Sequence, residues 1–277
     1  MQSNCDSPAM KEMMDSSTKM LKGKVALVTG GGTGIGRTIA LEFAKAGADV
    51  AVTSRNISTL KETAAEISIL GARALGVAAD VSKKAEVDSM YESVIAEFGN
   101  VDVLVNCAGG SARERSTLFC DSTEEIWDEI IALNYKGVLN VTRAVVNQMI
   151  AQRSGRVINI SSLDGVIGAA GRADYSGAKA AVIGFSCALA KEVAQHKITV
   201  NCISPGPVVS GYDEALLAGK SEESIKWAQQ IDSITGLGYG SKTDISSMAL
   251  FLASDNSAFI SGQNISVCGL ANINPGW

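Results

Sequence analysis

The stretch Val25-Ala26-Leu27-Val28-Thr29-Gly30-Gly31-Gly32-Thr33-Gly34-Ile35-Gly36 decides the fold. Its first four residues form a short apolar run, which is typical of a buried parallel strand. The glycines follow at once, and a helical pattern then runs from Arg37 to Ala46. A loop without side chains lets backbone amides approach a pyrophosphate, and the N-terminus of the next helix favours its charge. Strand, loop and helix together predict a dinucleotide-binding unit.

Outward from this unit, strand and helix patterns keep alternating. Strands are expected at Val25–Val28, Val50–Thr53, Ala74–Ala79, Val101–Val105, Arg156–Ser161, Thr199–Ile203 and Asn264–Val267, and helices at Arg37–Ala46, Ser58–Leu70, Ala85–Phe98, Thr123–Gln152, Asp174–Ala190 and Asp244–Leu252. Gly47, Gly71 and Gly99 each follow a helix, where a left-handed residue is favoured. The pattern predicts one Rossmann-like α/β domain, a doubly wound parallel sheet of seven strands with helices on both faces.

Three segments add detail to this alternation of strands and helices or depart from it. Ser122-Thr123-Glu124-Glu125 is a capping-box signature for the helix that follows it. Between Pro205 and Gly240 the alternation stops, and the short helices Glu214–Ala218 and Ser221–Ile231 are expected there. An insertion at about 207–240 lies near the carboxyl ends of the strands and is interpreted as a substrate lid, with a packing excursion as the alternative. Residues 1–20 lack periodicity and are expected to be a disordered extension before the domain at 21–277.

Composition excludes several classes of protein. The chain has 277 residues, 46% hydrophobic and 19% charged, and is therefore neither disordered nor collagen-like. A net charge of −5 argues against nucleic acid or an anionic membrane as a partner, and no apolar run is long enough to span a bilayer. Six scattered cysteines predict a reduced, cytoplasmic protein without a metal site. The single histidine, His196, argues against a Ser-His-Asp hydrolase.

The segment Asp174-Tyr175-Ser176-Gly177-Ala178-Lys179 opens a long apolar helix. Tyr175 and Lys179 are four residues apart, so they lie on one face of the helix, one turn apart. A neighbouring ammonium favours the ionised phenol, which suits proton transfer to or from a carbonyl or alcohol oxygen. Because Tyr-x-x-x-Lys alone is a weak signal, its weight depends on the other motifs.

With these motifs in place, the sequence resembles the short-chain dehydrogenase/reductase family over about residues 22–270. The resemblance rests on Thr29-Gly30-x-x-x-Gly34-x-Gly36, Asn106-Cys107-Ala108-Gly109, Asn134, Ser162, Tyr175-x-x-x-Lys179 and Pro205-Gly206. Two serines end the fifth strand, and the family spacing, with serine 13 positions before the tyrosine, selects Ser162 over Ser161. Two departures are Cys107, where the family usually has a second Asn, and Cys268-Gly269-Leu270, where it usually has Asp-Gly-Gly.

The resemblance implies the roles of the site residues. Tyr175 is the general acid in reduction and the base in oxidation, and Lys179 lowers its pKa and binds the nicotinamide ribose. Ser162 holds the substrate oxygen, and Asn134 positions a water that relays protons. The implied cofactor contacts are Gly30, Gly32, Thr33, Gly34, Ile35, Gly36, Ser54, Arg55, Asp80, Val81, Asn106, Ala108, Gly109, Tyr175, Lys179, Pro205, Gly206, Val208 and Ser210.

The residue at the end of the second strand distinguishes the two nicotinamide cofactors. An acidic side chain there binds a bare 2′-hydroxyl and repels a 2′-phosphate. Here Ser54 stands in that place, and Arg55 follows with a fork of donors that can pair with a phosphate. Thr33 is not the basic residue that NADP-using relatives often carry in the glycine loop. The sequence predicts NADP(H) rather than NAD(H).

The predicted function is hydride transfer between NADP(H) and a ketone or secondary alcohol. The family resemblance also implies a homotetramer or homodimer built on the helices that begin near Thr123 and Asp174. Two alternatives stay open: a non-catalytic NADP-binding regulator, and an enoyl reductase, dehydratase or epimerase on a related fold. Charged residues in the expected pocket segments, namely Arg113, Glu114, Arg115, Asp164 and Arg172, suggest a polar or anionic substrate unless they face solvent.

Overall fold

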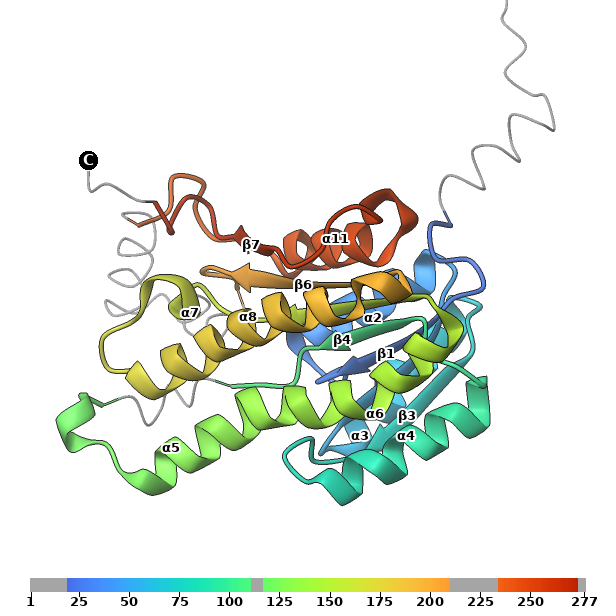
Figure 1. Cartoon of the computed structure of the whole chain (residues 1–277), viewed down its shortest axis with the longest axis horizontal. Helices are drawn as coiled ribbons and strands as arrows, with labels where there is room; N and C mark the ends of the chain where they lie inside the picture. The colour runs from blue at the N-terminus through green and yellow to red at the C-terminus, as the bar shows by residue number, and fades with distance from the viewer. Residues whose placement is uncertain (1–18, 111–116, 210–233, 274–277) are drawn as a thin grey trace, which may run out of the picture.

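The computed structural model describes residues 19–110, 117–209 and 234–273 of the chain (Figure 1). Seven strands form one sheet in the order β3-β2-β1-β4-β5-β6-β7. They are β1 (Val25–Thr29), β2 (Asp49–Ser54), β3 (Ala74–Ala78), β4 (Val103–Asn106), β5 (Gly155–Ile160), β6 (Ile198–Pro205) and β7 (Asn264–Val267). Every neighbouring pair is parallel. The predicted Rossmann-like parallel sheet is therefore confirmed.

Helices cover both faces of the sheet, because successive strand residues point to opposite sides. Ala26 and Val28 pack with α2 (Gly34–Lys45), α3 (Ile57–Ile69) and α11 (Lys242–Ala253). Val25 and Leu27 pack on the other side with α4 (Lys84–Phe98), α6 (Gly137–Gln152) and α8 (Ala173–Val193). Strands buried on both faces explain why their sequences are continuous apolar runs rather than alternating ones.

The carboxyl ends of all strands meet at one edge, on the left in Figure 1. The strand order reverses between β1 and β4, where the connections leave the sheet toward opposite faces. A ligand crevice forms at such a switch point. The glycine loop after β1 and the loop after β4 both begin there.

The helix expected at Thr123–Gln152 is interrupted. It consists of α5 (Glu124–Ile131), a π turn (Ala132–Lys136) and α6. The expected capping box at Ser122 is wrong: the N-cap is Thr123, without a side-chain cap, because the helix begins one residue later than the motif requires. A capping box instead begins α11, where Ser241 and Asp244 satisfy each other's backbone amides.

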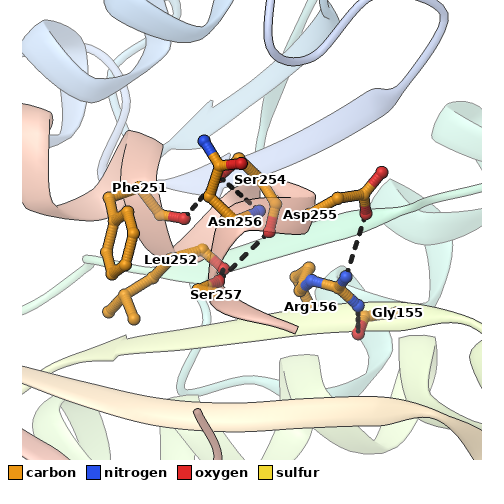
Figure 2. A network of polar contacts seen from close by, with 8 residues as sticks. All are labelled: Gly155, Arg156, Phe251, Leu252, Ser254, Asp255, Asn256 and Ser257. Carbon is orange, nitrogen blue, oxygen red and sulfur yellow. Dashed lines mark hydrogen bonds and ion pairs between the residues drawn. The ribbon is translucent and has the colours of Figure 1, made fainter. Parts of the chain in front are cut away.

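Short elements that the sequence pattern did not predict complete the fold: the 3₁₀ turns η2 (Phe119–Asp121), η4 (Ala194–His196) and η5 (Asp255–Ser257), and the helix α7 (Asp164–Ile167). Figure 2 shows how η5 closes the end of α11. The buried Ser257 hydroxyl donates to the Leu252 carbonyl at 3.0 Å, and Arg156 at the amino end of β5 donates to Asp255 at 3.1 Å. These bonds fasten the edge of the sheet opposite the switch point.

Two predicted features lie outside the described residues: the disordered extension, up to residue 18, and the helices Glu214–Ala218 and Ser221–Ile231 of the expected lid. Glycines predicted to follow helices at 47, 71 and 99 all have positive φ, of 92°, 87° and 85°. Within the described part of the chain, no helix combines the length and the apolar character needed to cross a bilayer.

Candidate active site

The glycine loop between β1 and α2 is packed too closely for side chains. A Cβ on Gly30 would lie 3.0 Å from the Ala108 backbone, and one on Gly36 would lie 2.3 Å from the Gly30 carbonyl oxygen. A Cβ on Gly32 would lie 2.4 Å from the Thr59 hydroxyl. The loop is therefore folded onto itself, onto the β4 loop and onto α3.

Gly34 differs from these glycines, because it has a φ of 55° and no neighbouring atom within 4 Å of an added Cβ. It is the first residue of α2, and Thr33 is the N-cap. Open space above exposed backbone amides at a helix N-terminus fits an anionic pyrophosphate. The residues that would hold the phosphates of a dinucleotide are therefore those of the loop itself, Gly32 to Gly36.

Thr29 fixes the relation between the glycine loop and the β4 loop. Its hydroxyl accepts hydrogen bonds from the backbone amides of Cys107 and Ala108, both at 3.0 Å. Thr29 belongs to the glycine motif, but the sequence alone predicted no role for its hydroxyl. The sequence did carry a signal for this role: Thr29 ends the buried strand β1, and the other four residues of that strand are all apolar.

The end of β2 and the end of β3 form the side expected to receive the adenosine. The Ser54 hydroxyl donates to the Asn56 carbonyl at 3.4 Å, and Arg55 is exposed to solvent. Burial acts to raise the pKa of Asp80, but hydrogen bonds from Ser82 outweigh it and, with the cations of Lys83 and Arg55, hold this pKa below its usual range. Arg55 therefore lies close enough to Asp80 for their charges to interact.

The loop after β4 is contacted by the side chains of Asn134 and Lys179, which both lie close to Gly109. The Asn134 amide donates to the carbonyls of Gly110 and Ile130, both at 3.0 Å, and its oxygen accepts from the Gly110 amide at 3.1 Å. A Cβ on Gly109 would lie 2.7 Å from this oxygen and 3.1 Å from the Lys179 ammonium. The π turn places Asn134 here, as π turns often do at functional sites.

Lys179 is 3% exposed, and its ammonium donates to the Ile160 carbonyl at 2.9 Å. Burial lowers its pKa to about 8, against the opposing effect of the thiols of Cys107 and Cys202. At pH 7 the ammonium is still mostly charged. It lies 5.8 Å from the centroid of the Tyr175 ring, so a positive charge stands beside the phenol, as the spacing predicted.

The two adjacent serines after β5 have different surroundings. Ser161 is buried, and its hydroxyl donates to the Lys179 carbonyl at 2.9 Å, which ties β5 to α8. Ser162 is partly exposed and accepts the Asp164 amide at 3.1 Å. Among the residues that the structure describes, none accepts a hydrogen bond from the Ser162 hydroxyl, so its proton can be offered to a ligand.

Because of this difference, an alanine substitution is expected to affect mainly catalysis at Ser162 and mainly stability at Ser161. If Ser162 holds the substrate oxygen as the family resemblance implies, Ser162→Ala is expected to lower kcat about 10²-fold and to leave the unfolding free energy within about 0.5 kcal/mol. Ser161→Ala is expected to cost about 1 kcal/mol of stability, because a buried hydrogen bond is lost. Steady-state rates and urea denaturation of both variants check this, and a larger kcat loss in Ser161→Ala would assign the serines the other way round.

Other predicted contacts lie at the same edge of the sheet. Asn106 turns its side chain into the core, where it donates to Thr142 at 3.0 Å and Asn159 at 2.8 Å, so only its backbone faces the crevice. Gly206 packs against Cys268, where a Cβ would come within 2.5 Å. The Val81 carbonyl accepts a hydrogen bond from the Asn140 side chain, and the Pro205 carbonyl accepts one from the Leu163 amide. Val208 is buried and forms a β-bridge with Gly240. Ser210 lies outside the described residues.

Two of the charged residues expected in the pocket neutralise each other. Arg172 and Asp164 form an ion pair at 2.8 Å, with both side chains mostly buried. Arg113, Glu114 and Arg115 lie outside the described residues. The described part of the pocket therefore gives no support to a substrate with anionic groups.

Comparison with known proteins agrees with this geometry. A profile of the short chain dehydrogenase family matches residues 24–221. The chain is 41% identical over 250 residues to a 3-oxoacyl-(acyl-carrier-protein) reductase of Staphylococcus aureus, covering 89% of this chain and 97% of the relative. It is 38% identical over 250 residues to a (2S)-(R)-hydroxy(phenyl)methylsuccinyl-CoA dehydrogenase subunit of Thauera aromatica, covering 90% and 96%.

Among solved structures, a NAD⁺-bound xylitol dehydrogenase superposes with a TM-score of 0.85 at 30% identity, covering 91% of this chain and 100% of that one. The profile match spans most of the chain, and the relatives are matched over nearly their whole length. The chain therefore belongs to the short-chain dehydrogenase family and is an oxidoreductase of the kind that uses NAD(P)(H).

Proposed function

We propose that the protein transfers a hydride between NADP(H) and a ketone or secondary alcohol. The observation that carries this proposal is the buried Lys179 ammonium, which stands beside the Tyr175 ring and next to Gly109 and Asn134. A positive charge beside a phenol favours the ionised form, which suits proton transfer at the substrate oxygen. Ketone chemistry is also the chemistry named for the Staphylococcus reductase.

In the direction of reduction, Tyr175 donates its proton to the carbonyl oxygen while Ser162 holds that oxygen by a hydrogen bond. The bound cofactor supplies the hydride to the carbonyl carbon. Lys179 keeps the phenol acidic, and its remaining N–H donors are available to a ribose hydroxyl. Asn134 keeps the β4 loop in place through Gly110 and shapes the path by which a proton can return to Tyr175.

The 2′-phosphate of NADP(H) is proposed to lie between Ser54 and Arg55. No carboxylate ends β2, and Arg55 is exposed in the short connection between β2 and α3, where its guanidinium can turn toward a phosphate. A neighbouring carboxylate, Asp80, follows β3 rather than β2 and accepts hydrogen bonds from the Ser82 amide and hydroxyl. We therefore expect the phosphate to meet one cation and no opposing carboxylate from β2.

The test is NADPH consumption followed at 340 nm with a panel of ketones and enoyl thioesters, repeated with NADH. We expect turnover of ketones, with kcat/KM for NADPH at least about tenfold above that for NADH, since a charge-assisted phosphate contact contributes roughly 1.5–3 kcal/mol. Preference for NADH would overturn the cofactor assignment. Turnover of enoyl thioesters alone would favour the enoyl-reductase alternative, and cofactor binding without turnover would favour the regulator.

Arg55→Ala separates the phosphate contact from general effects on the fold. It should raise the KM for NADPH about tenfold and leave the KM for NADH unchanged, because only NADPH carries the phosphate. Arg73→Ala is the matched control, since Arg73 pairs with Asp49 away from the switch point. Equal effects on both cofactors in Arg55→Ala would remove this residue from the proposed contact.

A further inference from the structure

The side chain of Asn140, on α6, is bonded to the turn after β3, residues 80–83, here called the β3 turn. Its amide donates to the Val81 carbonyl at 2.9 Å and to the Ser82 carbonyl at 3.3 Å. These partners lie 59 and 58 residues earlier in the sequence. Asn140 belongs to none of the motifs on which the family resemblance rests, so its contact with the β3 turn calls for an explanation of its own.

All other described hydrogen bonds of the β3 turn are local. The Ser82 amide and hydroxyl donate to the Asp80 carboxylate at 3.0 and 2.7 Å, and the Lys83 amide donates to the Asp80 carbonyl at 3.0 Å. The Asp80 amide donates to the Glu86 carboxylate at 2.8 Å. Within the part of the chain that the structure describes, only Asn140 bonds the β3 turn to a residue more than six positions away. The polar contacts that fix the turn against the rest of the domain therefore come from Asn140.

The packing of α6 brings the Asn140 side chain to this turn. Val81 is 4% exposed, and a Cβ on Gly137 would lie 2.7 Å from its Cγ2 atom. Gly137 is the first residue of α6, and residues three apart on a helix share one face. The same face of α6 therefore presents a glycine to the Val81 side chain and the Asn140 carboxamide to the backbone of the turn.

This arrangement leaves a donor and an acceptor of the β3 turn free. Among the described residues, none accepts a hydrogen bond from the Val81 amide, and none donates to the Asp80 Oδ2 atom. Adenine presents the acceptor N1 beside a donor amino group on one edge, and proteins recognise bases by hydrogen bonds to this edge. The free groups of the turn thus fit the base that the family resemblance places there, provided that the turn holds its position.

The helix that carries Asn140 also reaches the catalytic end of the crevice. Figure 1 shows α5, the π turn and α6 as one long helix, and Asn134 in the π turn bonds to Gly110 after β4. Asn134 and Asn140 are six residues apart, about 9 Å along the helix axis. One helix therefore holds both the turn expected to bind adenine and the loop beside the proposed proton donor.

We propose that Asn140 is a positioning residue for cofactor binding, which holds the β3 turn ready for the adenosine half of the dinucleotide. The proposal rests on the proposed function only in that the ligand is a nicotinamide dinucleotide, and it applies to NADP(H) and NAD(H) alike because both carry adenosine. Without the Asn140 amide, the turn keeps its local bonds but loses its attachment to α6. The cofactor then has to order the turn as it binds, which lowers its affinity.

The experiment measures the two halves of the cofactor separately in Asn140→Ala. The Kd for NADPH and the Kd for ADP, which carries the adenosine and the pyrophosphate, are both expected to rise about tenfold, the cost of ordering one further residue. The Kd for reduced nicotinamide mononucleotide, which lacks the adenosine, should be unchanged. At saturating NADPH kcat should also be unchanged, because no group of the proton transfer is altered. Calorimetry with ADP, fluorescence titration with the two reduced nucleotides and ketone reduction at 340 nm give these values.

Gln148→Ala is the matched control, because Gln148 is also a carboxamide on α6 that bonds to a loop backbone, accepting from the Val101 amide at 3.0 Å. It should lower the urea midpoint as Asn140→Ala does and leave both fragment Kd values unchanged. Asn140→Leu keeps the volume of the side chain and favours the helix, so it gives the same comparison should Asn140→Ala not fold.

An unchanged Kd for ADP in a folded Asn140 variant overturns the inference. Equal weakening of ADP and of reduced nicotinamide mononucleotide also overturns it, because the loss is then a general loosening of the domain. If the unaltered protein binds NADPH but reduces no ketone, the proposed function fails, and the Kd values decide the inference alone. If it binds neither NADPH nor NADH, both are overturned.

Discussion

Replacing Tyr175 with phenylalanine is expected to lower kcat about 10³-fold, within the range found for the loss of a positioned general acid. The hydroxyl group is the only part of the side chain that is lost. Lys179 remains buried beside the ring with its bond to Ile160, so the electrostatics of the pocket are preserved. The Kd for NADPH should change by no more than about tenfold, since at most one hydrogen bond to the cofactor, about 0.5–1.5 kcal/mol, is lost.

Tyr91→Phe is the control for this prediction, because it removes the same hydroxyl oxygen from a tyrosine on α4 rather than on α8. It should leave kcat unchanged. Rates and fluorescence titration with NADPH measure the two effects separately. Full activity in Tyr175→Phe would refute the assigned role, and a parallel loss of NADPH binding would make the tyrosine a cofactor contact rather than the proton donor.

The second large effect is expected from Gly36→Ala, which should weaken NADPH binding at least about 10²-fold. The new Cβ would lie 2.3 Å from the Gly30 carbonyl oxygen and 2.7 Å from its carbon, and both are backbone atoms that cannot rotate away. The loop and the first turn of α2 must therefore separate. A displacement of this kind, about 1 Å at a binding loop, is enough for a loss of that size. Overpacking should also lower the unfolding free energy by about 1–3 kcal/mol.

Gly184→Ala tests whether the loss at Gly36 comes from this contact. Gly184 lies in the interior of α8 with no neighbouring atom within 4 Å of an added Cβ. Alanine there should raise the unfolding free energy by about 0.5–1 kcal/mol, because it lowers the entropy of the unfolded chain, and should leave NADPH binding unchanged. Urea denaturation and fluorescence titration of both variants give the comparison. Unimpaired binding in Gly36→Ala would contradict the close packing of the loop.

The sheet and the position of the site could be predicted because their signals are local. Apolar runs such as Val25–Val28 and the glycines that follow them determine strand, loop and helix within twelve consecutive residues. Parallel strands then bring all the loops at their carboxyl ends to one edge. The Tyr175–Lys179 pairing is equally local, since helix geometry alone places the two residues on one face.

Element boundaries and short elements were predicted less well. The helix at Thr123–Gln152 was expected to be continuous, whereas the structure interrupts it with a π turn around Asn134. Asn134 hydrogen-bonds to Gly110, which lies 24 residues earlier in the sequence, and no local pattern encodes that contact. The capping box at Ser122 was predicted from four residues, and the structure begins the helix one residue later.

By itself, therefore, the sequence determined the seven-stranded parallel fold, the glycine loop and the family motifs, because periodicity and backbone freedom act over a few residues. Only the tertiary structure decided that Thr29 joins two loops, that Ser161 is buried while Ser162 is partly exposed, and that Asp164 neutralises Arg172. These outcomes depend on which partner each side chain meets in the folded domain. Thr29 and Cys107 are 78 residues apart and Ser161 and Lys179 are 18 apart, and the turn between α7 and α8 brings Asp164 and Arg172 together, so no local periodicity encodes the contacts.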